Sequence, residues 1–358
     1  MTGEAGGPGH WHMVVPGSLA QRTGGTIYDR RIVDGCRAAG QQVSVHELPG
    51  RFPEADPTAA GAMEQTLAGL PDGSVVVVDG LALGGLPDPA VRHGPRLRLL
   101  ALVHHPLADE TGLDAGRRSA LRRSEAIALA ACRGVIVTST FTARRLAAFD
   151  VAPARIRTVI PGTSPALGLP RAPRRPYPAL LCVAAVTPRK GHDTLAHALA
   201  RLREIPLRCT CVGSLSREPD FVARLRKLIT RLELEDRLLL AGELEGAALA
   251  RHYAEAALFV LPSRYEGYGM VFCEAMAHGL PVVAASAGAV PDTVPAQAGL
   301  LVPPDDPVAL AAAVRRCLEE PGLRERLAAG ARAHARRLPD WPQAARGFAS
   351  AMEELLRP

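Results

Sequence analysis

Residues 262–277 read PSRYEGYGMVFCEAMA and hold two carboxylates, Glu266 and Glu274, on either side of a Gly-x-Gly turn. The apolar run Leu258–Leu261 before this stretch is closed by a proline and predicts a short buried strand. Phe272–His278 predicts a helix that ends at the glycine and proline after it. We therefore expect Glu266 at the carboxyl end of a strand and Glu274 about one turn into a helix. In an open α/β sheet, ligands bind in that crevice.

The turn offers groups that suit a hydroxylated, anionic ligand. Backbone amides of Tyr268, Gly269 and Met270 at the helix start would attract an anion or hydroxyl oxygens. A carboxylate on each side would accept hydrogen bonds from vicinal hydroxyls. The alternative is an ordinary turn with two solvated glutamates, since a spaced Glu pair recurs by chance in many helices. The full pattern favours sugar or ribose binding.

This stretch resembles the retaining glycosyltransferases of family 4, whose hallmark is Glu-x7-Glu. Glu266 and Glu274 match that spacing, and the likeness continues through Gly279–Val283. The resemblance implies the GT-B fold, in which two doubly wound, Rossmann-like α/β domains face each other across a cleft. It also implies transfer of a hexosyl-type sugar from a nucleotide-diphosphate sugar, such as a UDP- or GDP-sugar, with retention of configuration.

Length and composition predict a two-domain protein. The 358 residues exceed one domain of ~150 residues, and a hydrophobic content of 47% is ample for two cores. No uninterrupted apolar run reaches the ~18 residues that indicate a membrane-spanning helix. The start, MTGEAGGPGH, is typical of a loose tail and lacks the basic and apolar regions of a signal peptide. We expect a cytoplasmic protein.

The cysteine count and the charge pattern argue against a disulfide-rich protein and a nucleic-acid-binding protein. An odd number of cysteines, seven, without C-x-x-C argues against a disulfide framework and predicts buried free thiols. We expect no metal site, because the adjacent pair His104 and His105 is too little for one. The net charge of +6 is spread along helices with no nucleic-acid motif. Such a field could draw in a nucleotide diphosphate or give a peripheral membrane contact.

Short apolar runs alternate with helical patterns along both halves of the chain, which predicts two parallel, doubly wound sheets. The expected strands of the first half are Trp11–Val15, Gln42–Leu48, Val75–Asp79, Arg98–His104, Gly134–Val137 and Arg157–Ile160, with helices near 26–39, 58–70, 116–132 and 141–149. Those of the second half are Ala179–Val186, Leu207–Gly213, Arg237–Leu240, Leu258–Leu261, Val282–Ala284 and Leu300–Val302, with helices near 193–204, 219–232, 245–256, 270–278, 307–319 and 322–337.

A Pro- and Arg-rich segment, Pro161–Pro178, has neither helical nor strand periodicity and predicts an interdomain linker. We place the first, acceptor-side domain at residues 1–165 and the second, donor-binding domain at 177–338. In the family, the last helix often returns to the first domain, so residues 342–358 are assigned there.

Arg189-Lys190-Gly191 follows the first strand of the second domain. Two cations at the carboxyl end of a strand can neutralise a diphosphate, which leaves with extra negative charge during transfer. The resemblance extends to this turn, where family members carry a basic residue and Lys-Gly. Many also place an arginine five residues before that lysine, where this chain has Ala185. Whether Arg189 replaces it stays open at this point.

Thr23-Gly24-Gly25-Thr26 follows the first strand and opens the first helix. Glycines allow close backbone approach to a phosphate, which the helix amides can then bind. Alone the pair is commonly only a turn, but family members carry a similar Gly-Gly loop. We expect it opposite Arg189 and Lys190, so that both domains hold the diphosphate.

His104-His105-Pro106 ends the fourth strand of the first domain. A histidine there could hydrogen-bond the transferred sugar or the acceptor hydroxyl near neutral pH, or be packed for structure alone. The family often has a histidine at the place of His104. Downstream, Glu110 and Glu125 are candidates for shaping the acceptor pocket.

The resemblance favours attack on the same face as the departing phosphate, whose oxygen helps to deprotonate the acceptor hydroxyl, over a double displacement. Glu266 would orient sugar hydroxyls and Glu274 would hold the ribose. No cofactor is required. The predicted catalytic residues are His104, Arg189, Lys190 and Glu266, and the predicted donor-binding residues are Gly24, Gly25, Arg189, Lys190, Glu266, Gly267, Tyr268, Gly269, Met270, Val271 and Glu274.

Other functions remain open from the sequence. A 2-epimerase-type enzyme or a pyridoxal-phosphate phosphorylase would share the GT-B fold. The missing arginine at Ala185 allows a non-catalytic, donor-binding partner subunit. An NAD dehydrogenase lacks its glycine fingerprint here. The acceptor could be a glycan, a lipid-linked sugar or a small metabolite, and we assign it to the loops near 79–96 and 105–118.

Overall fold

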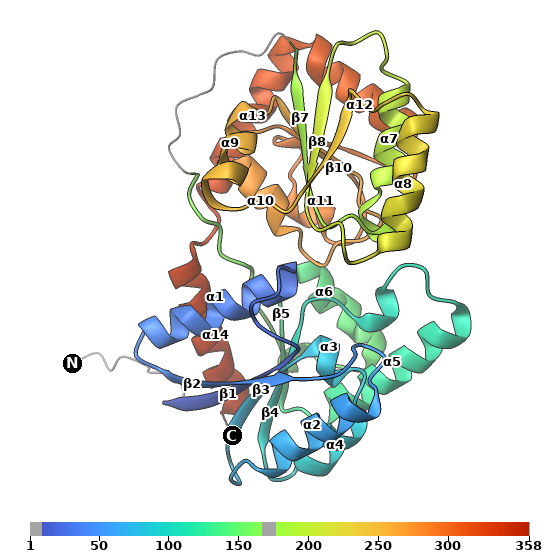
Figure 1. The fold of residues 1–358 in the computed structure, drawn as a ribbon. Helices are drawn as coiled ribbons and strands as arrows, with labels where there is room; N and C mark the ends of the chain where they lie inside the picture. Colours follow the sequence, from blue (N-terminus) through green and yellow to red (C-terminus); the bar gives the residue numbers. More distant parts are fainter. Residues whose placement is uncertain (1–8, 167–176, 358) are drawn as a thin grey trace, which may run out of the picture. The chain divides into compact units, whose positions relative to one another are not determined.

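The computed structural model describes residues 9–166 and 177–357. The chain divides into two compact units, Met1–Gly162 with Pro339–Pro358 and Thr163–Leu338. Each unit is an α/β domain built on one six-stranded sheet (Figure 1). Of the predicted linker Pro161–Pro178, residues 167–176 lie outside the described residues, as does most of the predicted N-terminal tail.

All strand pairs of the first sheet are parallel, in the order β2-β1-β3-β4-β5-β6. The strands are β1 (His10–Pro16), β2 (Gln42–Leu48), β3 (Val75–Asp79), β4 (Arg98–Val103), β5 (Gly134–Val137) and β6 (Ile156–Thr158). The helices are α1 (Gly24–Ala38), α2 (Pro57–Ala68), α3 (Gly80–Leu83), α4 (Pro87–His93), α5 (Ala115–Ala130), α6 (Thr140–Arg145) and α14 (Trp341–Leu356), with 3-10 turns at Leu107–Asp109, Leu146–Phe149 and Pro153–Arg155.

Two hydrophobic cores form because successive side chains of a strand point to opposite faces of the sheet. In β1, Trp11, Met13 and Val15 enter the core that α1 and α14 cover, whereas Val14 enters the core under α2, α4 and α5. Figure 1 shows these two helix layers on either side of the sheet. Strands buried on both faces explain why the apolar runs of the sequence are nearly continuous.

Helix α14 belongs to the first unit although it ends the chain. Phe348 is fully buried and its ring lies 5.9 Å from that of Trp11. A Cβ on Gly35 of α1 would lie 2.5 Å from Cβ of Ala345, so the glycine permits α1 and α14 to approach closely. The N-terminus of α14 is a capping box between Asp340 and Gln343.

The second sheet is also parallel, in the order β12-β11-β10-β7-β8-β9. Its strands are β7 (Ala179–Val183), β8 (Arg208–Val212), β9 (Leu238–Gly242), β10 (Leu258–Leu261), β11 (Val282–Ala285) and β12 (Gly299–Val302). Its helices are α7 (His192–Ala200), α8 (Pro219–Arg231), α9 (Gly246–Glu255), α10 (Met270–Ala277), α11 (Val290–Thr293), α12 (Pro307–Glu319) and α13 (Pro321–Ala335), with a 3-10 turn at Pro188–Lys190.

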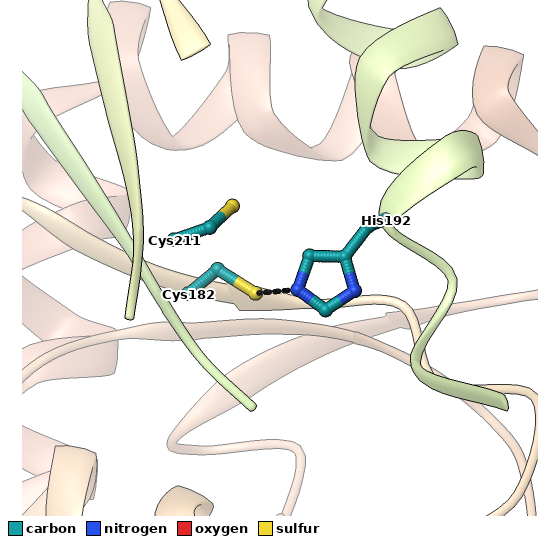
Figure 2. Close-up of side chains that lie close together, drawn as sticks. All are labelled: Cys182, His192 and Cys211. Atoms are coloured by element: carbon teal, nitrogen blue, oxygen red, sulfur yellow. Dashed lines mark hydrogen bonds between the residues drawn. The ribbon is translucent and has the colours of Figure 1, made fainter. Parts of the chain in front are cut away.

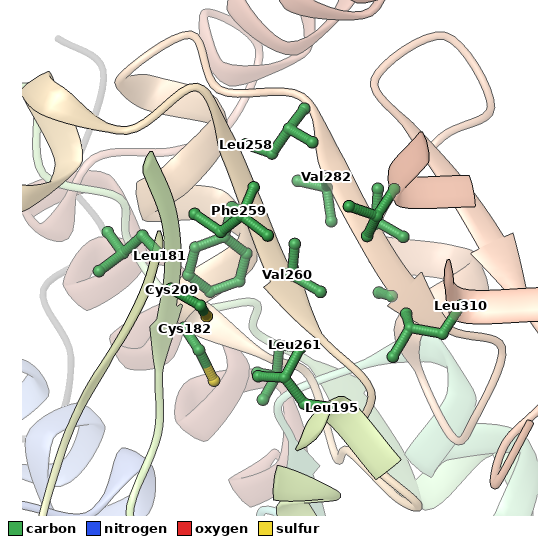
Figure 3. Packing of buried hydrophobic residues seen from close by; sticks show 14 of the residues in the cluster. Leu181, Cys182, Leu195, Cys209, Leu258, Phe259, Val260, Leu261, Val282 and Leu310 are labelled. Carbon is green, nitrogen blue, oxygen red and sulfur yellow. The ribbon is translucent and has the colours of Figure 1, made fainter. Parts of the chain in front are cut away.

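Helices α7, α8 and α12 lie on one face of this sheet, and α9, α10 and α13 lie on the other (Figure 1). The central strand β10 is fully buried on both faces, with Leu258–Leu261 surrounded by side chains from β7, β8, β11, α7 and α12 (Figure 3). The predicted doubly wound α/β class is confirmed in both units.

The structure corrects several predicted boundaries. The acceptor loop expected near 79–96 contains α3 and α4, because Asp79 caps one short helix and Pro87 begins the other. The segment near 105–118 contains a 3-10 turn and the start of α5. Strand β7 stops at Val183, three residues before the expected end, and β6 is displaced toward the N-terminus by one residue at its start. In the described part of the chain, no helix combines the length and apolarity needed to cross a bilayer.

Candidate donor-binding site

The second sheet has its topological switch point between β7 and β10. From β7 the chain runs outward through β8 to β9, then returns to β10 and runs the other way through β11 to β12. The loops after β7 and β10 therefore lie side by side at the carboxyl ends of these strands, which is where open α/β sheets bind ligands. Residues 184–191 form the first loop and residues 262–269 the second.

The two loops are joined by backbone contacts. Arg264 donates its backbone N–H to the carbonyl oxygen of Arg189 at 2.7 Å. Gly191 has φ +69°, and a Cβ there would overlap the carbonyl oxygen of Pro262. A left-handed residue this close to another chain segment must be glycine. Gly191 is thus the residue that lets the basic turn lie against the loop carrying Glu266.

Three predicted catalytic residues meet at this point. Lys190 donates from Nζ to Glu266 Oε1 at 2.6 Å, and the guanidinium NH1 of Arg189 lies 3.8 Å from Glu266 Oε2. Glu266 is 4% exposed, and Ser263 donates a further hydrogen bond to its Oε1 at 2.6 Å. Burial raises the pKa of Glu266, but the attraction of Lys190 and Arg189 outweighs burial and leaves that pKa lowered. Glu266 is therefore a carboxylate at neutral pH.

Burial also lowers the pKa of Lys190. The attraction of Glu266 partly offsets this lowering, and the positive charge of Arg189 adds to it. Arg189 donates from NH1 to the carbonyl oxygen of Tyr265 at 3.1 Å. The loops after β7 and β10 thus place two cations, Arg189 and Lys190, around the buried carboxylate of Glu266. Such a cluster can bind an anionic group through the cations and a hydroxyl through the carboxylate.

The helix after the turn begins at Met270, as expected for the helix near 270–278 and two residues before the Phe272 expected from the motif. Gly269 has φ +88° and precedes α10 without a side-chain cap. The amides of the first turn of α10 are therefore positioned as hydrogen-bond donors at the positive end of the helix dipole. Val271 lies in this first turn, and the carbonyl oxygen of Tyr268 accepts a hydrogen bond from Thr293 Oγ1 at 2.7 Å. Gly267 lies in the loop between Glu266 and this helix start.

Glu274 lies on α10, one turn from its start, and is half-buried. Its Oε2 accepts a hydrogen bond from Tyr253 of α9 at 2.9 Å. The Tyr253 ring stacks on His278 with centroids 4.8 Å apart, and burial together with Glu274 raises the pKa of its hydroxyl. Tyr253 therefore orients Glu274 as a neutral donor.

In the first unit, Gly25 lies directly against His104. A Cβ on Gly25 would be 3.1 Å from Cδ2 of the imidazole. Gly24 begins α1, whose cap is Thr23 in a reciprocal pair with Thr26. The Gly-Gly loop and the strand-end histidine are thus neighbours, which their separation in the sequence does not reveal.

His104 contacts two aspartates that sequence reasoning left without a role. Its Nε2 lies 3.0 Å from Asp29 Oδ1 and 3.2 Å from Asp79 Oδ2. Burial lowers the pKa of His104, but the two carboxylates outweigh burial and raise it to about 10. Burial raises the pKa of Asp29 to about 7, against the lowering effect of His104. The raised pKa favours the imidazolium form of His104 at neutral pH.

Glu125, a candidate for the acceptor pocket, instead has its carboxylate buried against a backbone turn. Its two oxygens accept hydrogen bonds from the N–H groups of Leu107 and Ala108. Burial raises the pKa of Glu125 to about 7. Glu110 accepts from Thr111 and lies beside His105.

Two signals could have led to the missed residues. Asp79 is a polar residue at the end of an all-valine buried strand, and Asp29 occupies a core-facing position of α1 near Ile32 and Val33. Ser263 and Tyr253 carry no such signal, because a serine in a loop and a tyrosine in a helix are ordinary.

Residues 177–320 match the family model of group 1 glycosyl transferases. A D-inositol 3-phosphate glycosyltransferase of Xylanimonas cellulosilytica is 38% identical over 169 residues, which are 47% of this chain and 40% of that protein. An MMP alpha-(1->4)-mannosyltransferase of Mycolicibacterium hassiacum is 31% identical over 262 residues, 69% of this chain and 63% of its own. The second unit belongs to the group 1 glycosyltransferase family.

This assignment confirms the family resemblance. The aligned segments span about half the length of these two curated relatives, 40% of the first and 63% of the second. Sucrose-phosphate synthase from Thermosynechococcus elongatus superposes with a TM-score of 0.78 at 24% identity, covering 96% of this chain and 99% of its own. Anabaena HepE, in complex with UDP-glucose, gives 0.74 at 21% identity over 96% and 100% of the two chains. These likenesses confirm the GT-B fold.

Proposed function

We propose that this chain transfers a hexosyl-type sugar from a nucleotide-diphosphate sugar to an acceptor hydroxyl, with retention of configuration. The observation that supports the proposal most is the meeting of Arg189, Lys190 and Glu266 at the switch point of the second sheet. Names of relatives point the same way, because a glycosyltransferase, a mannosyltransferase and a UDP-glucose complex occur among them.

In the proposed complex, Lys190 and Arg189 contact the diphosphate. Lys190 supplies a point charge and Arg189 a planar fork. Arg189 thereby replaces the arginine that many family members have at the position of Ala185. The amides of Gly269 and Met270 add donors at the positive end of α10. These groups stabilise the charge that grows on the leaving phosphate, and one such contact contributes ~3 kcal/mol to lowering the barrier.

Glu266 orients the transferred sugar and Glu274 holds the ribose. Glu266 Oε1 already accepts from Lys190 and Ser263, whereas Oε2, 3.8 Å from Arg189, keeps lone pairs for a sugar hydroxyl. Glu274 is held by the hydrogen bond from Tyr253 to its Oε2, and a carboxylate is an acceptor that suits vicinal ribose hydroxyls. Neither glutamate acts as a covalent catalyst in this proposal.

The transfer reaction takes place on one face of the sugar. The bond from the anomeric carbon to the phosphate oxygen breaks as the bond to the acceptor oxygen forms, and the acceptor proton passes to the phosphate. Gly24 and Gly25 are further proposed donor-binding residues, and His104 is proposed to contact the transferred sugar or the acceptor as an imidazolium. No cofactor is required. The cytoplasmic location and a peripheral membrane contact stay predictions.

A thermal-shift screen against UDP, GDP, ADP and dTDP tests the donor site. A diphosphate present at about 100 times its dissociation constant stabilises the protein by ~2.7 kcal/mol. One of the four should raise the melting temperature, and the Lys190→Ala and Glu274→Ala variants should lose that rise. Transfer from the matching nucleotide sugar should fall ~100-fold or more in Lys190→Ala. A flat response to all four nucleotides contradicts the donor site.

The replacement of the usual arginine by Ala185 favours one second candidate, a donor-binding subunit that lacks turnover of its own. Tight nucleotide binding without transfer or donor hydrolysis, with activity restored by a second protein, would support that candidate. Epimerised donor without a glycoside product would point to a 2-epimerase.

A further inference from the structure

Two cysteines and a histidine converge in the core of the second unit, beside the basic turn Arg189-Lys190-Gly191, called the donor turn from here on. Cys182 of β7 and Cys211 of β8 are register partners on neighbouring parallel strands, so their side chains share a face of the sheet. His192 is the first residue of α7, and its ring reaches Cys182 (Figure 2). All three side chains are buried, with at most 1% of any residue exposed.

The distances suit a metal ion. Cys182 Sγ lies 3.7 Å from His192 Nε2, and the ligand atoms of all three residues lie within 4.8 Å of one another. Zinc bonds of ~2.3 Å to sulfur and ~2.0 Å to nitrogen at a tetrahedral angle separate the two ligand atoms by about 3.5 Å. The cysteine–histidine separation of 3.7 Å is therefore close to that of two ligands on one ion.

The charges suit a divalent, thiophilic ion. Two thiolates and a neutral imidazole bring the total charge of the site with such an ion to zero, which avoids a buried net charge. A hydrogen bond with Cys211, together with burial, raises the pKa of Cys182 well above its usual value, so the thiol is protonated before an ion arrives. Binding then releases one proton from each thiol.

Little is lost when the ion binds. Among the described residues, no group is hydrogen-bonded to the buried Nδ1 of His192, and its Nε2 contacts Cys182. With the proton on Nδ1, the lone pair of Nε2 faces the sulfur and is available to a metal. The interactions that an ion replaces are weak thiol contacts.

We propose that Cys182, Cys211 and His192 form a binding site for one thiophilic divalent cation such as Zn²⁺. The three protein ligands leave one coordination position open. Gly191 alone separates His192 from Lys190, so a bound ion joins the sheet to the start of α7 directly beneath the donor turn. The site does not depend on the proposed transferase activity.

The test uses the full chain after removal of metals with a chelator. Titration with Cd²⁺ should give the ultraviolet thiolate-to-metal charge-transfer band, saturating at about one ion per chain. A weakly buffered solution with a pH indicator should report about two protons released per ion. Zn²⁺ should displace Cd²⁺ and raise the melting temperature.

Variants of the three ligands should each weaken the ion's affinity at least tenfold: Cys182→Ser, Cys211→Ser and His192→Asn. The matched controls are Cys317→Ser in the same unit and Cys36→Ser in the other, both buried cysteines outside the cluster. They should bind Cd²⁺ like the parent. His192→Asn keeps every thiol, so it carries the test even if a cysteine variant fails to fold.

Three outcomes overturn the proposal. The first is binding of less than about one tenth of an ion per folded chain. The second is equal Cd²⁺ affinity in the parent and His192→Asn. The third is loss of Cd²⁺ binding in a control variant but not in the ligand variants. Loss of nucleotide binding has no bearing on these readouts, so failure of the metal site and failure of the donor site are distinguishable.

Discussion

Lys190 donates a hydrogen bond to Glu266 at 2.6 Å inside the second unit. The sequence assigned the two residues to different parts of the donor, the lysine to the phosphates and the glutamate to the sugar. In the structure they form one buried ion pair, because the loops after β7 and β10 meet at the switch point. Each residue therefore favours the charged form of the other and helps to fix its position.

Removal of either partner should destabilise the second unit. A single substitution, Lys190→Met or Glu266→Gln, leaves the remaining group without its partner, and we expect a loss of ~3 kcal/mol in unfolding free energy. The double variant should lose clearly less than the sum of the two. Urea unfolding of all four proteins measures this coupling. Strict additivity would contradict a direct pair.

Gly191→Ala should be the most damaging glycine substitution in the donor turn. The new Cβ meets the Pro262 carbonyl and the residue keeps a positive φ, so we expect a loss of ~3 kcal/mol and weaker nucleotide binding. Gly242→Ala is the matched control. Gly242 has φ +73° in the same unit with no atom near its missing Cβ, so only the ~1 kcal/mol backbone cost applies. Equal losses in the two variants would show that the contact with Pro262 is unimportant.

Stability of the first unit should decline as pH rises from 7 to 10. A histidine whose folded pKa is raised to about 10 stabilises the fold below its unfolded value of 6.5, and that stability is lost through the folded pKa. Asp29, with its pKa raised to about 7, acts in the same direction at lower pH. Asp29→Asn removes one carboxylate from His104 and should flatten the decline.

Unfolding free energies at several pH values check this prediction. His334→Gln in α13 is the control, because burial lowers the pKa of His334 and no carboxylate raises it. A pH profile of Asp29→Asn that parallels that of the parent would exclude the ion pair as the cause.

Phe348→Ala should detach α14 from the first sheet. Phe348 is fully buried against Trp11, and truncation of such a ring costs ~3–5 kcal/mol. Ser350→Ala on the exposed side of the same helix should change stability by less than ~0.5 kcal/mol. Denaturant unfolding followed by tryptophan fluorescence compares them. A small effect of Phe348→Ala would mean that α14 contributes little to this core.

Long periodic elements were predictable because local chemistry sets them. Gln42–Leu48, Val75–Asp79, Gly134–Val137 and Leu258–Leu261 are strands with the predicted bounds, since the first alternates apolar and polar residues at its start and the other three are apolar runs. Helices α3, α4 and α11 were missed because a helix of four to seven residues has at most about two turns, too few to show the 3.6-residue period. Strand β7 ends early, where the chain turns toward the donor loop.

The sequence by itself determined the doubly wound class, the family and the strand–helix turn that carries Glu266 and Glu274. Hydrophobic periodicity and turn residues act over a few positions, so they can be read along the chain. Only the tertiary structure decided which distant residues meet: Lys190 with Glu266, His104 with Asp29 and Asp79, and Cys182 with Cys211 and His192. Parallel strand order joins segments that lie far apart in the chain, and the burial that results sets their charge states.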